Sequence, residues 1–216
     1  MNILILGATG LVGNDCLEIL INKPSIKNVI CPTRKPLHPH EKLTNPDFNT
    51  WLNDIEHNPK LLNTIDAVIC CLGTTIKLAK TKEQFKFIDH TLVLKIATIC
   101  KQANISIFAY NSSLGANINS KQLYVQTKGL VEFDLTQLDF NYLSIVRPSL
   151  LVGKSRPEFR FGEWLAIHFT LLCNPLLPKK YQSIKTMTVA KALCHLVMTP
   201  SKKVVILESD NLQNFL

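Results

Sequence analysis

The opening stretch, residues 2–20, constrains the fold more than any other part of the sequence. It reads NILILGATGLVGNDCLEIL and places three of the chain's eight glycines, Gly7, Gly10 and Gly13, directly after an apolar run. That run has no periodicity, which is typical of a strand buried on both faces. The apolar residues that follow recur at helical spacing. We therefore predict a strand, a tight glycine turn and a helix.

The rest of the chain alternates strand and helix patterns. Short apolar runs predict strands at 28–34, 65–73, 105–113, 141–149 and 203–209, and helical spacing predicts helices at 81–99, 123–138 and 188–198. Thr81 with Gln84 reads as a capping box, and Thr188 as an N-cap. Such alternation predicts an α/β fold, a doubly wound parallel sheet of the Rossmann type, as one domain over 1–216. Residues 154–186 break the alternation and predict a small C-terminal helical insertion on the substrate side.

Composition excludes several classes of protein. The net charge of +8 is scattered in short groups with no long basic run, which favours a solvated surface over a nucleic-acid site. The seven cysteines lie in apolar contexts without metal-ligand spacing, so we expect reduced thiols, no metal site and a cytoplasmic protein. We expect neither a leader peptide nor a membrane span, because each apolar stretch is short or interrupted.

The glycine turn predicts a dinucleotide site. Ligands of open parallel sheets bind beyond the carboxyl ends of the strands, where a helix N-terminus offers free N–H groups and the positive end of its dipole. Glycine allows the tight turn, the close approach of backbone to a pyrophosphate and the packing of helix on strand. The spacing is G-x-x-G-x-x-G, and its position between a strand and a helix strengthens the interpretation over a merely structural turn.

The end of the second predicted strand favours NADP(H) over NAD(H). A carboxylate there would bind a ribose 2′-hydroxyl, but the sequence CPTRKP has Arg34 and Lys35 instead. Cations at this place suit a 2′-phosphate; the alternative is two exposed surface cations. Asp47, after a probable third strand, is a candidate acceptor for the adenine amino group or an ordinary turn aspartate.

A second group of residues suggests proton transfer. Tyr124 and Lys128 lie four positions apart in a predicted helix and so share a face. An ammonium near a phenol favours the phenolate, which helps the phenol exchange a proton with a carbonyl or an alcohol. Ser112 and Ser113 end a predicted strand on the ligand side of the sheet, where a serine can orient the substrate oxygen. Surface packing is the alternative explanation of the Tyr/Lys pair.

With these motifs the chain resembles an atypical short-chain dehydrogenase/reductase, and most closely the Tat-interacting-protein (CC3-like) branch. The matching stretches are GATGLVG, TRK, DAVICCLGTT, NSSLGAN, YVQTKGLVE, IVRPSLLVG and RFGEWLA, in family order over nearly the whole chain. The resemblance implies a cofactor site and a Ser–Tyr–Lys site made of Ser113, Tyr124 and Lys128, with Ser112 as the rival serine. The implied cofactor residues are Gly7, Thr9, Gly10, Leu11, Val12, Gly13, Arg34, Lys35, Leu72, Gly73, Thr74 and Pro148.

Two functions follow as expectations. The first is an NADP(H)-dependent oxidoreductase acting on a small carbonyl or alcohol of unknown identity. The second is an NADPH-binding regulatory or assembly protein with little turnover and a protein partner; a homodimer is compatible with either. Asp89 stands near where typical members carry an asparagine of a proton relay, which favours the second function, whereas the complete Ser–Tyr–Lys set favours the first.

Overall fold

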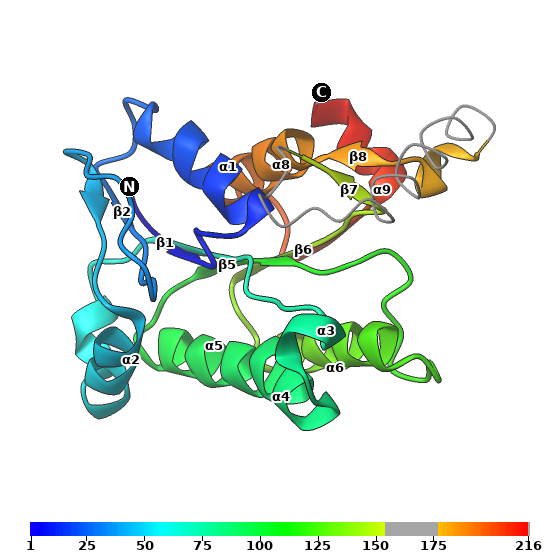
Figure 1. The fold of residues 1–216 in the computed structure, drawn as a ribbon. Helices are drawn as coiled ribbons and strands as arrows, with labels where there is room; N and C mark the ends of the chain where they lie inside the picture. The colour runs from blue at the N-terminus through cyan, green and yellow to red at the C-terminus, as the bar shows by residue number, and fades with distance from the viewer. Residues whose placement is uncertain (154–176, 216) are drawn as a thin grey trace.

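The computed structural model describes residues 1–153 and 177–215, and its centre is a parallel sheet of seven strands in the order β3-β2-β1-β4-β5-β6-β9 (Figure 1). The strands are β1 Asn2–Leu6, β2 Asn28–Ile30, β3 Leu43–Thr44, β4 Ala67–Cys70, β5 Ile107–Asn111, β6 Tyr142–Arg147 and β9 Val204–Glu208. A second sheet pairs β7 Leu151–Val152 with β8 Ile184–Lys185 in parallel. The doubly wound fold expected from the sequence is confirmed.

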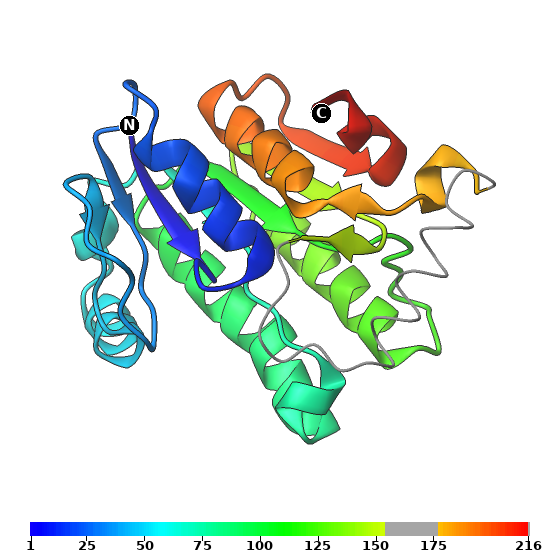
Figure 2. The same cartoon turned by 45° about the horizontal axis from the view of Figure 1, so that its top comes forward.

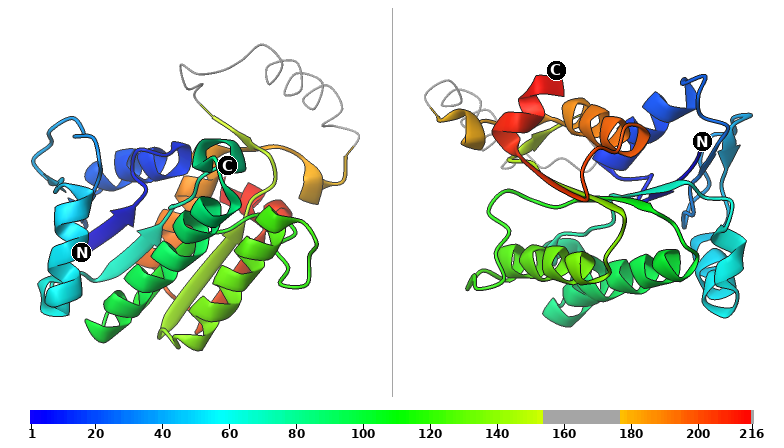
Figure 3. Two further views of the ribbon diagram at one scale, coloured as in Figure 1. Left: turned by 60° about the horizontal axis from the view of Figure 1, so that its bottom comes forward. Right: turned by 180° about the vertical axis from the view of Figure 1, so that it is seen from behind.

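Helices cover both faces of the main sheet. On one face lie α1 Leu11–Ile21, α8 Thr186–Met198 and α9 Ser209–Leu212, with α1 and α8 side by side (Figure 2). The other face carries α2 Phe48–His57, α5 Leu92–Gln102 and α6 Leu123–Gln137 (Figure 3). Two short helices, α3 Ile76–Ala79 and α4 Lys82–Lys86, and a π-helical turn, η2 Phe87–Thr91, precede α5. Single 3-10 turns are η1 Pro59–Leu62, η4 Lys179–Tyr181 and η5 Gln213–Phe215.

The buried strands feed two hydrophobic layers. Along β1 the side chains of Ile3 and Ile5 join the layer under α1 and α8, whereas Leu4 and Leu6 join the layer under α5 and α6. Successive strand residues point to opposite faces, so a strand covered on both sides needs an unbroken apolar run. The same rule separates Cys70 and Cys71, whose side chains belong to opposite layers, as the sequence predicts.

Some predicted boundaries are wrong. The strand predicted over 28–34 ends at Ile30. Beyond it the Cys31 N–H still donates to the Thr44 carbonyl at 2.8 Å and Thr33 forms a bridge with Asp47, but Pro32 between them has no N–H to donate. The predicted N-cap Thr188 lies inside α8, which begins at Thr186 with Lys185 as N-cap. Thr81, in contrast, does cap its helix, accepting a hydrogen bond from the Gln84 N–H at 3.0 Å.

Part of the predicted insertion falls outside the described residues. Residues 154–176 belong to that part, and residues 177–186 contribute η4 and β8. Among the helices that the structure describes, none has the length and apolar character needed to cross a bilayer.

Candidate functional site

The site lies where the chain leaves β1 and β4, the neighbouring strands at which the strand order reverses. Gly7 follows β1 with φ +83°, a conformation that side chains other than glycine rarely adopt. A Cβ at Gly7 would stand 2.6 Å from the carbonyl oxygen of Cys71, which follows β4. The glycine therefore allows the two chain segments to meet at the crevice that binds ligands in sheets of this type.

The other two glycines of the turn bring the helix onto the strand. The N–H of Gly10, the N-cap of α1, donates to the carbonyl of Gly7 at 2.9 Å. A Cβ at Gly13 would lie 2.2 Å from the same carbonyl oxygen, so only glycine permits this approach. The first N–H groups of α1, from Leu11 and Val12 onward, have no partner one turn earlier in the helix and carry the positive end of its dipole. Thr9 is exposed beside them. This geometry fits a diphosphate.

The residues predicted to select the cofactor lie after β2. Arg34 and Lys35 are both exposed, and no ion pair joins either to another described residue. Asp47 is the N-cap of α2 and accepts from the N–H groups of Asn49 and Thr50 at 3.1 and 3.0 Å. The hydrogen bonds from Thr50 lower the pKa of this carboxyl. Asp47 therefore has a structural role as the N-cap of α2, and its contact with adenine stays a prediction.

A buried carboxylate closes the loop after β4. Asp89 lies in the π-helical turn, where the N–H of Leu92 bonds five residues back to Phe87, and its side chain is fully buried. Its Oδ2 accepts from the N–H of Thr74 at 2.7 Å. A Cβ at Gly73 would lie 3.3 Å from its Oδ1. Asp89 therefore holds the segment Leu72–Gly73–Thr74 that the resemblance places beside the cofactor.

Lys128 is buried against the same carboxylate. Its Nζ lies 3.3 Å from Asp89 Oδ1 and donates to the Tyr110 hydroxyl at 3.0 Å. Burial alone would lower the pKa of Lys128, but the Tyr110 hydroxyl and the Asp89 carboxylate outweigh burial and raise it. Burial raises the pKa of Asp89 despite the ammonium and the Thr74 amide. Both groups therefore hold a proton more tightly than they do in water.

Tyr124 stands at the open side of this cluster. It is 39% exposed, and Lys128 Nζ lies 6.0 Å from the centroid of its ring. The predicted shared face of Tyr124 and Lys128 is therefore present. The ammonium, however, donates to the hydroxyl of Tyr110, a residue that the sequence analysis does not single out. A tyrosine inside an otherwise apolar strand was the available signal, since a buried hydroxyl needs a polar partner.

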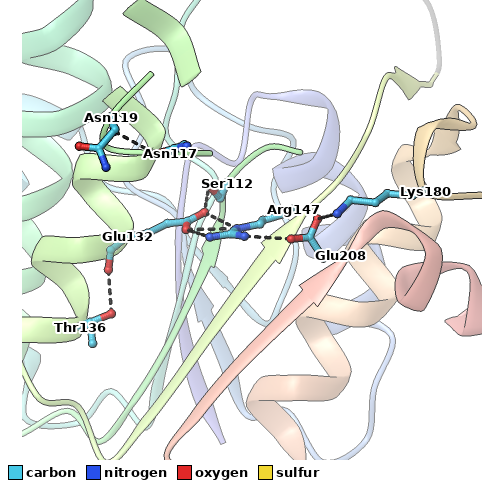
Figure 4. Close-up of polar contacts among 8 residues, drawn as sticks. All are labelled: Ser112, Asn117, Asn119, Glu132, Thr136, Arg147, Lys180 and Glu208. Carbon is cyan, nitrogen blue, oxygen red and sulfur yellow. Dashed lines mark hydrogen bonds and ion pairs between the residues drawn. The ribbon is translucent and has the colours of Figure 1, made fainter. Parts of the chain in front are cut away.

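The two serines after β5 differ in their contacts. The Ser112 hydroxyl donates to the buried carboxylate of Glu132 (Figure 4). Ser113 is 9% exposed, and its Oγ has no hydrogen-bond partner among the described residues. An unpartnered buried hydroxyl suits a group that binds a substrate oxygen. The geometry therefore favours Ser113 over Ser112 as the site serine.

The loop that follows Ser113 packs onto the first turns of α6. A Cβ at Gly129 would lie 2.4 Å from the backbone of Asn117 and Ile118. The N–H of Asn117 donates to the carbonyl of Val125 at 3.2 Å. On the other side, the N–H of Leu114 donates to the carbonyl of buried Pro148 at 2.8 Å. These contacts hold the segment of Ser113 between α6 and the end of β6.

Comparison with known proteins decides the family. No model of a known protein family matches the sequence. FMP52 of Candida albicans is 31% identical over 172 residues, which are 77% of this chain and 74% of that protein. HTATIP2 of Rattus norvegicus is 32% identical over 205 residues, covering 92% of this chain and 82% of that protein. The chain belongs to the HTATIP2 and FMP52 family of atypical short-chain dehydrogenase/reductase proteins. The predicted resemblance is confirmed.

Solved structures agree with this family in fold. The oxidoreductase ylbE from Lactococcus lactis has a TM-score of 0.68 at 18% identity and covers 99% of this chain and 96% of its own. MoeE5, solved in complex with UDP-glucose and NAD, has a TM-score of 0.72 at 16% identity and covers 96% of this chain and 75% of its own. The fold is therefore of the Rossmann type.

One expectation from the sequence, a cytoplasmic location, is wrong. The FMP52 relatives from Candida albicans and Debaryomyces hansenii are named as mitochondrial proteins. The six cysteines of the described residues are indeed unpaired, and burial raises the pKa of Cys31 and of Cys70 to about 12. Unpaired buried thiols do not distinguish one reducing compartment from another, so they could not indicate the cytoplasm.

Proposed function

We propose that the protein is an NADP(H)-dependent oxidoreductase that interconverts a small carbonyl compound and its alcohol. The observation that carries the proposal is the buried Lys128 ammonium, which lies 6.0 Å from the ring centroid of the exposed Tyr124 and binds the Tyr110 hydroxyl on β5. The Ser113 hydroxyl, which has no hydrogen-bond partner among the described residues, follows the end of the same strand and supports the proposal. Membership of a family of Rossmann oxidoreductase type supports the same reaction class.

The turn after β1 would hold the cofactor diphosphate. Gly7, Thr9 and the N-terminal residues of α1 offer N–H groups and the space that a Cβ would fill. Leu72, Gly73 and Thr74 would line the adenosine ribose, and Pro148 would flank the nicotinamide. The exposed cations Arg34 and Lys35 support a 2′-phosphate, and therefore NADP(H) in preference to NAD(H).

When bound, the reduced nicotinamide supplies a hydride to the substrate carbonyl carbon. Ser113 donates a hydrogen bond to the carbonyl oxygen and orients it. Tyr124 donates its phenolic proton to that oxygen, which completes the alcohol and leaves a phenolate that regains a proton from water. The Lys128 ammonium stabilises this phenolate, and Asp89 and Tyr110 hold the ammonium in place. In the reverse direction each transfer is inverted.

Asp89 stands near the place where typical members carry an asparagine, and this difference favours a second candidate function. A protein that keeps NADPH bound, turns over little and acts through a protein partner needs the cofactor seat without the proton relay. We also propose that the chain is mitochondrial, as the names of the FMP52 relatives indicate for those proteins.

Turnover separates the two functions. We expect NADPH oxidation with at least one member of a panel of aldehydes, ketones and quinones. The loss of absorbance at 340 nm measures this oxidation. Tyr124→Phe should abolish it, because phenylalanine has no proton to donate, whereas Tyr142→Phe, at the start of β6 and the opposite end of the sheet, should not. Tight NADPH binding with no turnover on any substrate would reject the oxidoreductase and leave the regulator.

Cofactor choice is tested by Arg34→Ala. Loss of one charge-assisted hydrogen bond should weaken NADPH by about 1.5–3 kcal/mol, or roughly tenfold to a hundredfold in Kd. NADH, which lacks the 2′-phosphate, should bind as before. Lys60→Ala, an exposed cation in η1, serves as the control for net charge. Equal weakening of both cofactors would contradict the 2′-phosphate assignment.

A further inference from the structure

A row of alternating charges runs from α6 across the ends of β6 and β9 (Figure 4). It consists of Glu132, Arg147, Glu208 and Lys180, and the Ser112 hydroxyl binds at its inner end. We propose that Glu132 is a positioning residue for the site serine: through Ser112 it fixes Ser113 against the helix that carries Tyr124 and Lys128. The proposal rests on the proposed oxidoreductase function, because that function gives Ser113 its role.

The carboxylate of Glu132 is fully engaged. Its side chain is 7% exposed, and Arg147 Nε donates to its two oxygens at 3.0 and 3.2 Å. Oε1 also accepts from the Ser112 hydroxyl. A buried carboxylate held by a guanidinium and a hydroxyl is fixed in direction, because turning it would leave charged groups without partners. Glu132 therefore holds groups in place and does not touch the reacting atoms.

The hydrogen bond between Glu132 and Ser112 joins the two segments that carry the proposed catalytic residues, α6 and the chain after β5. Tyr124, Lys128 and Glu132 are four residues apart on α6 and so lie along one side of the helix. Lys128 binds the Tyr110 hydroxyl on β5, and Glu132 binds Ser112 directly after β5. Helix α6 therefore contacts the end of β5 at two points. Ser113 is the residue after Ser112, so its position relative to Tyr124 depends on these two contacts.

Two further charged residues, Glu208 and Lys180, lie on the outer side of Arg147. Arg147 Nη1 donates to Glu208 at 2.9 Å, and Lys180 Nζ lies 3.5 Å from the same carboxylate. Arg147, the last residue of β6, therefore faces two carboxylates, the inner one buried and the outer one 26% exposed. The outer pair is open to solvent and should contribute less than the inner one. Glu208 consequently offers a matched control for Glu132.

The test compares Glu132→Gln with Glu208→Gln in the full chain. We expect Glu132→Gln to lower kcat about tenfold or more while the Kd for NADPH changes less than twofold, and Glu208→Gln to change kcat less than twofold. Ser112→Ala should reproduce the effect and carries the same test where Glu132→Gln fails to fold. In a Ser113→Ala background Glu132→Gln should change kcat less than twofold, because the group that it positions is gone.

A second readout does not need turnover. Amide hydrogen exchange of residues 112–116 should rise in Glu132→Gln and Ser112→Ala, and that of residues 7–13 should stay as in the unaltered protein. Losses of kcat that multiply with those of Ser113→Ala would overturn the proposal, as would unchanged exchange at 112–116. If the unaltered protein turns over no substrate, the proposed function fails by itself, and the exchange at 112–116 then decides for or against the positioning.

Discussion

The Gly7→Ala substitution places a methyl group where the end of β1 meets the chain after β4. The new Cβ would lie 2.6 Å from the Cys71 carbonyl oxygen, and the backbone at Gly7 has φ +83°. Holding an alanine in this left-handed region costs about 1–2 kcal/mol. Moving two buried backbone segments apart adds about 1–3 kcal/mol. We therefore expect the free energy of unfolding to fall by roughly 2–5 kcal/mol.

Two other glycines separate these contributions. Gly115 has φ +79° and nothing within 4 Å of its would-be Cβ, so Gly115→Ala carries only the backbone strain. Gly13 has no positive φ, but its Cβ would lie 2.2 Å from the Gly7 carbonyl oxygen, so Gly13→Ala carries only the steric conflict. Gly7→Ala should therefore destabilise the protein more than Gly115→Ala, by about 1–3 kcal/mol.

The free energy of unfolding of the three variants is measured by urea unfolding, with circular dichroism as the signal. With a denaturant slope of about 3 kcal/mol/M, a loss of 3 kcal/mol lowers the midpoint by about 1 M. NADPH fluorescence on the folded variants should show weaker binding for Gly7→Ala and Gly13→Ala and unchanged binding for Gly115→Ala. If Gly7→Ala were no less stable than Gly115→Ala and bound NADPH normally, the close approach of the two segments would be refuted.

Two further predictions concern the buried cluster and the core. Asp89→Asn leaves the Lys128 ammonium buried without its carboxylate and should lower the free energy of unfolding by about 3 kcal/mol at pH 7. In the native protein the pKa of Lys128 is raised, so its contribution is fully present below about pH 10.5 and is lost as pH rises through the folded pKa. In the Asp89→Asn variant, burial instead favours the neutral amine of Lys128. The difference in the free energy of unfolding between the native protein and the variant, measured by urea unfolding, should therefore narrow as pH rises toward 10. A difference that stays constant with pH would contradict the ion pair. Phe108→Ala, which empties a fully buried site whose ring stacks on Phe140 at 4.9 Å, should cost about 3–5 kcal/mol by the same measurement, and a loss below 1 kcal/mol would show that the site collapses.

The sequence predicted the parts of the fold that local patterns determine. Unbroken apolar runs identified β1, β4, β5 and β6, because strands covered on both faces need them. Glycines placed between strand and helix identified the turn at Gly7. In contrast, α2 was not predicted, since only Trp51 and Ile55 of its ten residues are buried and its pattern is mostly polar. The start of α8 was placed too late, because β8 leads directly into it.

The site was predicted less completely than the fold. Spacing on one helix was enough to pair Tyr124 with Lys128. The partners of Lys128, by contrast, come from η2 and β5, and no local pattern joins segments so far apart in the sequence. The same holds for Glu132, which lies in a predicted helix but meets Ser112 and Arg147, at the ends of β5 and β6, only in the folded chain. Only the structure shows that Ser112 is engaged and Ser113 is not.

The π-helical turn makes the acid at position 89 sensitive to chain length. Between Phe87 and Thr91 the helix holds one residue more per turn than its neighbours, as the bond from Leu92 to Phe87 records. Deleting one residue there would restore regular winding and leave the turns before and after it nearly in register, because the wide turn already contains the extra residue. The residues inside the turn would change direction instead, and Asp89 is one of them. A deletion in this turn would therefore displace the carboxylate from Lys128 although no side chain had been exchanged.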